Sequence, residues 1–220
     1  MTDTLRSIRL GPDAPEAMLV IVPGYGDRPE PFLDRISRFG LHERWSLIAV
    51  EPRSSGPQGP HWYEVDENGP DPIALGSSIA AIDEFCRDAL AESGLAEDRL
   101  VIAGFSQGGA LALAHLLDPS TSCSPRAVAA LAAYLPTRAD DRIDLRRAQE
   151  RPLLLAHGRD DETVETLRGR SAARALHRAG GLVSWYEVDG GHRFDEPLTT
   201  PLRSWLEALA RGEHPTAPPI

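Results

Sequence analysis

Short apolar runs alternate with longer helical patterns from one end of the chain to the other. Most of the short runs are apolar at consecutive positions, which is typical of strands covered by helices on both faces. The predicted strands are Met18–Val22, Leu47–Val50, Leu100–Ala103, Ala127–Leu131, Leu153–Ala156 and Leu182–Val188, with Ser7–Leu10 as a further edge strand.

Helical patterns lie between these runs. The predicted helices span Ile73–Ser93, Gln107–Leu117, Thr163–Ala179 and Pro197–Ala210. The first follows an Asp71-Pro72 start signal and stops at Gly94. Strands separated by helices imply right-handed crossovers. The fold class is therefore α/β, with a mostly parallel central sheet of about six or seven strands and helices on both faces.

The alternation is not interrupted by a linker or by an internal repeat. We therefore expect one domain over residues 1–211, followed by a frayed tail at 212–220. The stretch from Glu51 to Pro72 is rich in proline and glycine and lies inside the alternation. It is interpreted as a long loop, and loops of that length usually carry function or are mobile.

The charge balance narrows the classes of function. The 220 residues include 33 acidic and 23 basic side chains, a formal net charge of −10, and every basic one is arginine. A chain without lysine can form neither a lysine Schiff base nor a P-loop. The acidic balance disfavours nucleic acid and anionic membrane surfaces as partners.

Cysteine content and hydropathy predict a cytoplasmic protein. Cys86 and Cys123 cannot build a disulfide framework, and neither belongs to a paired metal-ligand motif. No run reaches the ~20 apolar residues that cross a bilayer, and the Met1 end lacks a signal-peptide pattern. We expect no metal site and no stable membrane association.

The strongest chemical signal is Gly104-Phe105-Ser106-Gln107-Gly108, which lies between a predicted strand and a predicted helix. A nucleophile elbow is a tight turn between a strand and a helix. That turn tolerates only small residues two positions before and after the serine, as here. A dinucleotide-binding turn is the alternative, but the glycine spacing does not match that fingerprint. Ser106 is therefore the candidate nucleophile.

A serine hydroxyl needs a base, and the base needs a carboxylate to orient it. His192 lies in a loop between the last predicted strand and the last predicted helix, at the sheet edge where α/β proteins bind ligands. The other histidines that follow the elbow with room for a strand between are weaker candidates. His157 ends a strand, His177 lies within a helix and His214 lies in the tail.

The carboxylate is expected in the segment that follows the strand at 153–156. Asp160 and Asp161 both lie on the loop that enters the next helix. Either fits the orienting role, while the other fits a helix cap. Asp189 is a weaker competitor because it is so close in sequence to His192. Spacing alone does not choose between Asp160 and Asp161.

An oxyanion hole needs two backbone N–H groups aimed at the developing negative charge. One is expected from Gln107, the residue after the nucleophile. The other is expected from the loop Pro23-Gly24-Tyr25-Gly26-Asp27, whose two glycines let the backbone approach a substrate closely.

These segments together resemble the acyl-protein thioesterase, carboxylesterase and phospholipase group of α/β-hydrolases. The resemblance runs from about Met18 to Phe194 and rests on GFSQGG at 104–109, HGRDDETV at 157–164, GGHRF at 190–194, PGYGD at 23–27, AYLP at 133–136 and the segment around Trp62. It implies an α/β-hydrolase fold. It also implies cleavage of carboxylic ester or thioester bonds through an acyl-enzyme, without a metal or an organic cofactor.

The resemblance also assigns roles to residues. In the family's H-G-x-x-D-x-x-V segment the catalytic aspartate falls on Asp161. Ser106 and His192 carry over as nucleophile and base, and the N–H groups of Tyr25 and Gln107 carry over as oxyanion donors. His157 and Gly158 then take scaffold positions of the same motif rather than catalytic ones.

Three departures from the family pattern bear on substrate choice more than on chemistry. Pro23 stands where the family usually has histidine, and Ala132-Ala133 replaces its Ser-Gly pair. The segment after Asp27 reads Arg28-Pro29-Glu30-Pro31 and lacks the family's usual glycine.

An apolar, partly aromatic acyl pocket is expected around Ser106. Its predicted lining is Trp62, Tyr63, Tyr134, Leu135, Val164 and Phe194. Small soluble carboxylic esters are the first choice of substrate, and acylated proteins or acyl thioesters are the second. The alternatives are a non-catalytic ligand-binding protein on a hydrolase scaffold, or a peptidase or lactone hydrolase with the same triad. The sequence does not specify the oligomeric state, for which a monomer or a weak homodimer is expected.

Overall fold

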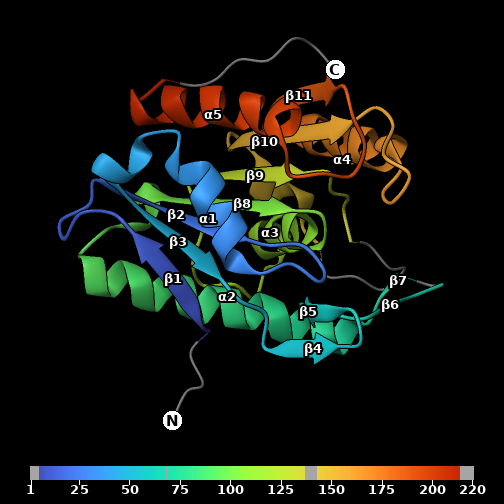
Figure 1. Ribbon diagram of the computed structural model, residues 1–220, viewed down its shortest axis with the longest axis horizontal. Coiled ribbons are helices and arrows are strands. Elements are labelled where there is room, and N and C mark those ends of the chain that lie inside the picture. Colours follow the sequence, from blue (N-terminus) through green and yellow to red (C-terminus); the bar gives the residue numbers. More distant parts are fainter. Residues whose placement is uncertain (1–4, 68, 137–142, 214–220) are drawn as a thin grey trace.

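A seven-stranded sheet forms the centre of the computed structural model, which describes residues 5–67, 69–136 and 143–213 (Figure 1). The strand order is β1-β3-β2-β8-β9-β10-β11, and β1 pairs antiparallel with β3 while the other neighbours are parallel. The strands are β1 (Ser7–Leu10), β2 (Ala17–Val22), β3 (Trp45–Val50), β8 (Leu100–Phe105), β9 (Ala127–Leu131), β10 (Pro152–Gly158) and β11 (Leu182–Val188). This arrangement confirms the predicted fold class.

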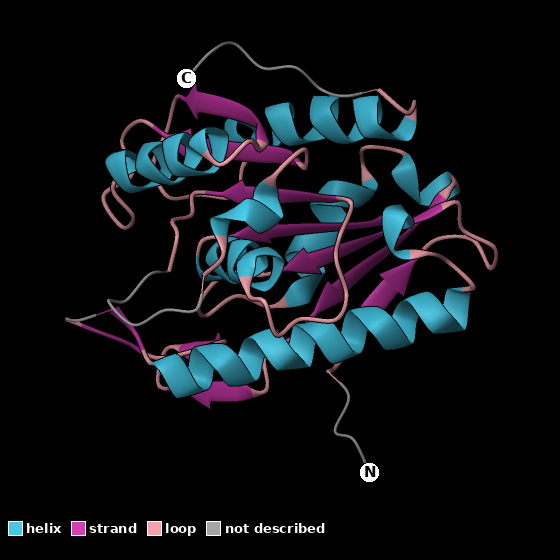
Figure 2. Cartoon of the chain, turned by 180° about the vertical axis from the view of Figure 1, so that it is seen from behind, coloured by secondary structure: helices cyan, strands magenta, loops and turns pink. Residues whose placement is uncertain are grey.

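Helices cover both faces of the sheet because alternate strand residues point in opposite directions. The helices are α1 (Pro29–Ser37), α2 (Pro72–Ser93), α3 (Gln107–Leu117), α4 (Thr166–Arg178) and α5 (Glu196–Ala210). Met18 and Val20 of β2 lie in a core cluster with residues of α2, α3 and α4. Leu19 and Ile21 of the same strand belong to a second cluster, with residues of α1 and α5. The long helix α2 is plain in the view from behind (Figure 2).

The predicted elements agree with the structure closely, with differences at their ends. β9, β11, α3 and the edge strand β1 have the predicted bounds. The helix predicted from Thr163 begins at Thr166 instead, because Asp161 accepts hydrogen bonds from the N–H groups of Thr163 and Val164 and holds that segment in a turn.

The sequence interpretation did not anticipate α1. Pro29 and Pro31 gave the segment the look of a loop, but Pro29 occupies the first turn, where a missing N–H and a fixed φ are harmless. Phe32 and Ile36, four residues apart, are buried on one face of this helix and anchor it to the sheet.

The stretch from Glu51 to Pro72, interpreted as a long loop, contains two small hairpins. The first joins β4 (Ser54–Gly56) to β5 (Gly59–His61), and the second joins β6 (Val65–Asp66) to β7 (Gly69–Pro70). Gly59 and Gly69 have φ values of 111° and 112°, which residues with side chains rarely adopt. The segment does connect a strand of the central sheet to the next helix, as expected, but it contains regular hairpins and is not a simple loop.

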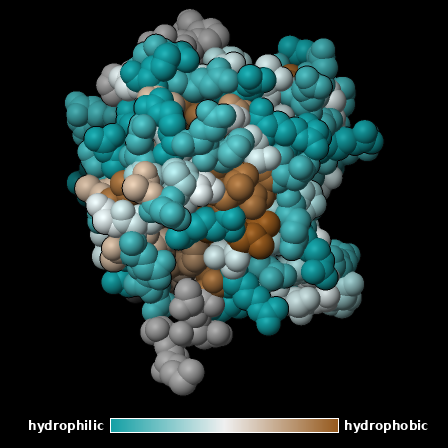
Figure 3. Space-filling view, turned by 60° about the vertical axis from the view of Figure 1, so that its left-hand side comes forward, coloured by the Kyte–Doolittle hydropathy of each residue, from teal (hydrophilic) through white to brown (hydrophobic). Residues whose placement is uncertain are grey.

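Short 3₁₀ turns complete the described elements: η1 (Leu41–Glu43), η2 (Glu97–Arg99) and η3 (Leu145–Ala148). Most of the predicted frayed tail, residues 214–220, lies outside the described residues. Gly212 and Glu213 bond back to the last turn of α5. Among the described helices, none combines the length and the apolar character that a membrane span requires. The surface in Figure 3 is mostly hydrophilic on the side displayed, with small apolar areas.

Candidate active site

The turn that carries Ser106 joins β8 to α3 and holds a strained backbone. Ser106 has φ 53° and ψ −120°, a conformation that only a tightly enforced turn maintains for a residue with a side chain. Its N–H donates to the carbonyl of Leu131 at the end of the neighbouring strand. The side chain remains partly exposed at the carboxyl edge of the sheet, directly before the N-terminus of α3.

The glycines on either side of Ser106 are required by close backbone approach. A Cβ on Gly104 would lie 2.3 Å from the carbonyl oxygen of Gly108, and one on Gly108 would lie 2.1 Å from that of Val22. Neither position therefore accepts a side chain without moving the backbone. This is the steric requirement that the sequence motif predicted for a nucleophile elbow.

His192 joins Ser106 to Asp161 across the edge of the sheet. Its Nε2 lies 2.8 Å from Ser106 Oγ, and its Nδ1 lies 2.7 Å from Asp161 Oδ2. The three residues come from the turn after β8, the loop after β10 and the loop after β11. The carboxylate thus fixes the ring so that Nε2 faces the serine hydroxyl.

Asp161, not Asp160, occupies the position beside His192. The Asp161 side chain has no exposed area, whereas Asp160 is exposed. Asp189 is also exposed, and its carboxylate forms an ion pair with Arg159. The choice that spacing left open is therefore decided by which carboxylate the turn at 161–164 buries.

Four donors surround the buried Asp161 carboxylate. Oδ1 accepts the N–H groups of Thr163 at 3.0 Å and Val164 at 2.8 Å. Oδ2 faces both His192 and His157, whose Nε2 lies 3.2 Å away. A carboxylate with two acceptor oxygens accommodates about four such donors, so its hydrogen-bonding capacity is filled.

His157 is a contact that the sequence interpretation missed, since it placed this residue in the scaffold without a partner. Its ring is buried, and Nε2 also lies 2.8 Å from the carbonyl of Val164. Burial lowers the pKa of His157, which favours the neutral ring. A Cβ on Gly169 would lie 2.4 Å from His157 Nδ1, so the ring is packed tightly in place. The four-residue spacing of His157 and Asp161 was the available signal.

The loop from Pro23 to Asp27 packs directly against the elbow. A Cβ on Gly24 would lie 3.1 Å from the Phe105 ring, and one on Gly108 would lie 2.3 Å from the Pro23 carbonyl oxygen. The N–H groups of Tyr25 and Gln107 donate to no residue in the described ranges. Two predicted donors therefore lie on adjoining backbone segments beside the serine.

The Gln107 side chain ties the elbow to the segment after the first hairpin. Its Oε1 accepts the N–H of Trp62 at 2.8 Å, and its Nε2 donates to the Tyr63 carbonyl at 2.6 Å. The Trp62 indole N–H donates to the Pro23 carbonyl at 2.9 Å, which links the same segment to the loop from Pro23 to Asp27. Trp62 and Tyr63, predicted to line a pocket, are almost fully buried in this network.

The other predicted pocket residues lie in two groups. Tyr134 and Val164 are buried together with Ala110, and the Arg168 guanidinium stacks over the Tyr134 ring at 4.1 Å; Leu135, next in the chain, is partly buried. Phe194 packs on Phe32, with ring centroids 4.4 Å apart. The role of these residues in binding an acyl group stays a prediction.

Two features near His192 had no counterpart in the sequence interpretation. Phe105 lies against the His192 ring, with centroids 4.9 Å apart, and so limits its movement. Asp27, at the end of the loop that begins at Pro23, is a half-buried carboxyl close enough to His192 for their charges to interact. Burial raises the pKa of Asp27, while a hydrogen bond donated by the Gly24 backbone N–H opposes that shift.

The described part of the chain contains no cluster of three or more metal-ligating side chains. The groups that meet at this edge of the sheet are a hydroxyl, an imidazole, a carboxylate and backbone N–H groups.

Known proteins resemble this chain in sequence and in structure. A probable carboxylesterase SOBER1-like of Arabidopsis thaliana is 29% identical over 196 residues, which are 84% of this chain and 73% of that protein. Acyl-protein thioesterase 1 of Gibberella zeae is 27% identical over 197 residues, 80% of this chain and 83% of that protein. The crystal structure of a carboxylesterase from Mesorhizobium loti superposes with a TM-score of 0.78 at 23% identity, covering 94% of this chain and 97% of that one.

The family comparison spans nearly the whole chain. A family model described as phospholipase/carboxylesterase matches residues 6–209, which include the elbow, the buried aspartate and the His192 loop. Together with the α/β-hydrolase fold of the structural neighbours, this match shows that the chain belongs to the phospholipase/carboxylesterase family and is a hydrolase of ester or thioester bonds.

Proposed function

We propose that Ser106, His192 and Asp161 form the catalytic triad of this hydrolase. The observation that carries the proposal is the continuous chain of hydrogen bonds, 2.8 Å from Ser106 to His192 and 2.7 Å from His192 to Asp161. In the first step His192 Nε2 takes the hydroxyl proton while Ser106 Oγ attacks the acyl carbonyl carbon. Asp161 keeps the proton of His192 on Nδ1 and stabilises the imidazolium that forms.

The backbone N–H groups of Tyr25 and Gln107 stabilise the oxyanion of the tetrahedral intermediate. Both belong to rigid segments, since Gln107 begins α3 and the Tyr25 loop is fixed by a Gly26 N–H bond of 2.7 Å to the Pro60 carbonyl. His192 then gives its proton to the leaving alcohol or thiol. Water attacks the acyl-enzyme with His192 again as base, releasing the acid and restoring Ser106.

Soluble esters are the proposed first substrates, with acyl thioesters and acylated proteins second. The net charge of −10 opposes binding to an anionic membrane surface, and the same charge opposes binding to nucleic acid. We also propose that the protein acts in the cytoplasm, in keeping with its two buried, unpaired cysteines.

The test is hydrolysis of a p-nitrophenyl ester by the wild type and by Ser106→Ala. We expect Ser106→Ala to lose activity by about four orders of magnitude or more and to keep its fold. A fluorophosphonate probe should label the wild type and not the variant. Labelling at another residue, or activity retained by Ser106→Ala, would refute the assignment. Folded wild type that neither turns over esters nor takes the label would instead be a binding protein on this scaffold.

A further inference from the structure

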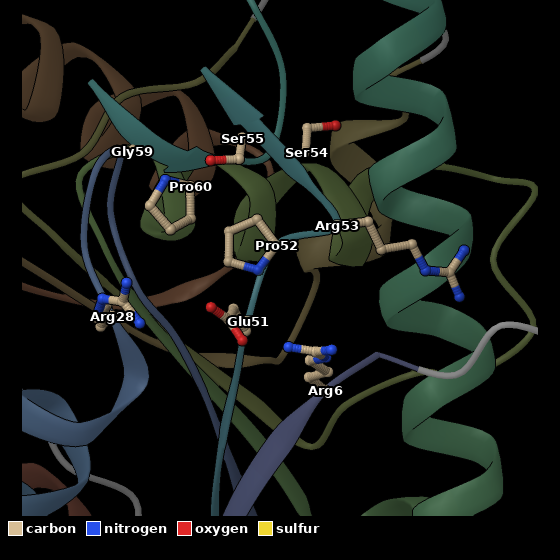
Figure 4. Close-up of a pocket in the computed structure, with 9 residues that line it drawn as sticks. All are labelled: Arg6, Arg28, Glu51, Pro52, Arg53, Ser54, Ser55, Gly59 and Pro60. Atoms are coloured by element: carbon tan, nitrogen blue, oxygen red, sulfur yellow. The ribbon is translucent and has the colours of Figure 1, made fainter. Parts of the chain in front are cut away.

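A cavity outside the triad gathers positive charge in a protein that is otherwise acidic. It has a volume of about 490 Å³ and lies where β3 leaves the sheet. Its lining includes Arg6, Arg28 and Arg53, together with Glu51, Ser54 and Ser55 (Figure 4). Three arginines and one glutamate leave a formal charge of +2 in the cavity, against −10 for the whole chain. That volume lies within the range of small-molecule sites.

The arginine side chains of this cavity are unpaired within the described part of the chain. Those of Arg6, Arg28 and Arg53 form no hydrogen bond or ion pair with any residue in the described ranges. Many other arginines of the chain are paired, such as Arg44 with Glu16 and Arg203 with Glu207. In Figure 4 the Glu51 carboxylate lies between Arg6 and Arg28, and Arg53 extends toward α2 at the rim. Arg6 and Arg28, which lack a side-chain acceptor among the described residues, thus flank Glu51 in this cavity.

The cavity shares a wall with the loop that carries Tyr25. Pro60, in its lining, accepts the Gly26 N–H at 2.7 Å, and a Cβ on Gly59 would lie 3.1 Å from the Gly26 Cα. Arg28 follows Gly26 by two residues. One strand, β2, separates β3 from β8 in the sheet, so the carboxyl ends of β3 and β8 lie about 10 Å apart at ordinary strand spacing. A ligand that extends from Ser106 to the cavity therefore has to be elongated.

We propose that this cavity is a subsite for a carboxylate at the far end of the substrate, away from the ester that Ser106 attacks. The inference rests on the proposed function of the triad and narrows its substrate class to esters that carry a distal carboxylate. The planar guanidinium of arginine presents paired N–H donors that match the two oxygens of a carboxylate. Glu51 lowers the net positive charge of the cavity.

The test compares mono-p-nitrophenyl esters of succinate, adipate and suberate with the carboxamide-capped esters of the same lengths. The acid and amide forms differ in charge and hardly in shape. We expect wild-type kcat/KM to favour the acid by about tenfold at the length that reaches the cavity, mainly through KM. The net charge of −10 repels anions, so such a preference cannot come from the overall field. The preference of the wild type for the acid form should weaken as ionic strength rises.

Substitutions of the arginines and of Glu51 should change the acid-to-amide ratio of kcat/KM in opposite directions. Arg28→Gln and Arg6→Gln should bring the acid-to-amide ratio of kcat/KM close to one, and Arg28→Lys should restore part of it. Glu51→Gln should raise the ratio about twofold to threefold, because it removes the negative charge facing the carboxylate. Arg178→Gln, an equal loss of charge at the exposed end of α4, is the matched control and should leave the ratio unchanged.

Failure of this subsite is distinguishable from failure of the triad. Calorimetric titration of folded Ser106→Ala with the suberate half-ester measures binding without turnover, and Arg28→Gln in that background should weaken it about tenfold. If Ser106→Ala is inactive while the wild type shows no preference for the acid at any length, the subsite proposal is overturned and the triad stands. An equal fall in the ratio with Arg178→Gln would also overturn it. Turnover of the esters by Ser106→Ala would overturn the triad.

Discussion

Two buried aspartates of this chain, Asp161 and Asp83, each pair with a histidine ring, but the partner that is fully buried differs between the two pairs. In the pair of Asp161 and His192 the carboxylate has no exposed area, and 15% of the histidine side chain is exposed. In the pair of Asp83 and His115 the histidine has none, and 11% of the aspartate side chain is exposed. The first pair lies at the carboxyl edge of the sheet, and the second between α2 and α3.

The comparison indicates that a histidine–carboxylate pair can act as a catalytic base only when the ring nitrogen that does not face the carboxylate contacts a reactive group. His192 Nε2 meets the hydroxyl of Ser106, while the remaining nitrogen of His115, Nδ1, is buried without a hydrogen-bond partner among the described residues. Asp83 instead uses its oxygens structurally, accepting the N–H groups of Ser122 at 3.1 Å and Cys123 at 2.8 Å. It thereby ties the loop after α3 to α2, so the second pair is expected to contribute stability and not turnover.

The largest expected difference between the two pairs is in activity, when the histidine of each pair is replaced in a separate variant. His192→Ala should lower kcat/KM for a p-nitrophenyl ester by about 10⁴-fold, with a smaller fall in Tm than His115→Ala, because His157 and two backbone N–H groups still hold the Asp161 carboxylate. His115→Ala should leave kcat/KM within about twofold and lower the free energy of unfolding by about 3 kcal/mol, since it leaves Asp83 short of a buried partner. Equal losses of activity in the two variants would remove the distinction.

Asp161→Asn should lower activity nearly as much as His192→Ala, and it tests whether Asp161 orients the His192 ring. Because the oxygen at Oδ1 must still accept the N–H groups of Thr163 and Val164, the new amide nitrogen takes the place of Oδ2. It then faces His192 Nδ1 with N–H groups and forces the proton onto Nε2, toward Ser106. We expect kcat to fall by about 10³- to 10⁴-fold. Activity within tenfold of the wild type would contradict the proposed role of Asp161.

Asp83→Asn should change stability in a pH-dependent way. Although burial disfavours the charged carboxylate, hydrogen bonds from His115, Cys123 and Ser122 hold the pKa of Asp83 well below its usual range. A depressed pKa in the folded state gives stability that is complete above the unfolded pKa of about 4 and is lost as the pH falls below it. In urea unfolding at pH 7 the variant should be less stable by about 2–4 kcal/mol. That gap should narrow between pH 5 and about pH 3; a gap independent of pH would contradict this account.

Most of the sheet could be predicted from the sequence because its strands are continuous apolar runs with polar or glycine-rich ends. β9 and β11 have the predicted bounds for that reason. α1 was missed because Pro29 and Pro31 mask a helix whose two anchoring residues, Phe32 and Ile36, are its main apolar signal. The hairpins after β3 depend on glycine conformations and cross-strand pairing, which local periodicity does not encode.

At the site, the sequence predicted which residues the structure brings together but not how they are held. Ser106 and His192 followed from an elbow motif and a loop at the correct edge. The choice between Asp160 and Asp161 depends on which of two adjacent side chains a turn buries, and spacing does not specify that. The contact of His157 with Asp161 and the cavity around Glu51 arise from tertiary packing of segments that no single motif contains.

The smallest effect concerns the thiols beside the second pair. Burial raises the pKa of Cys123 to about 12 and that of Cys86 well above its usual value, so neither forms the reactive thiolate at neutral pH. We expect both to react with a disulfide reagent at pH 8 at least about 100-fold more slowly in the native protein than in urea. Asp83→Asn should speed the labelling of Cys123 severalfold, because that aspartate holds the Cys123 N–H. Rapid native labelling of both thiols would mean that the region around Asp83 opens readily, which would contradict its assignment as the closed, structural counterpart of the Ser106 site.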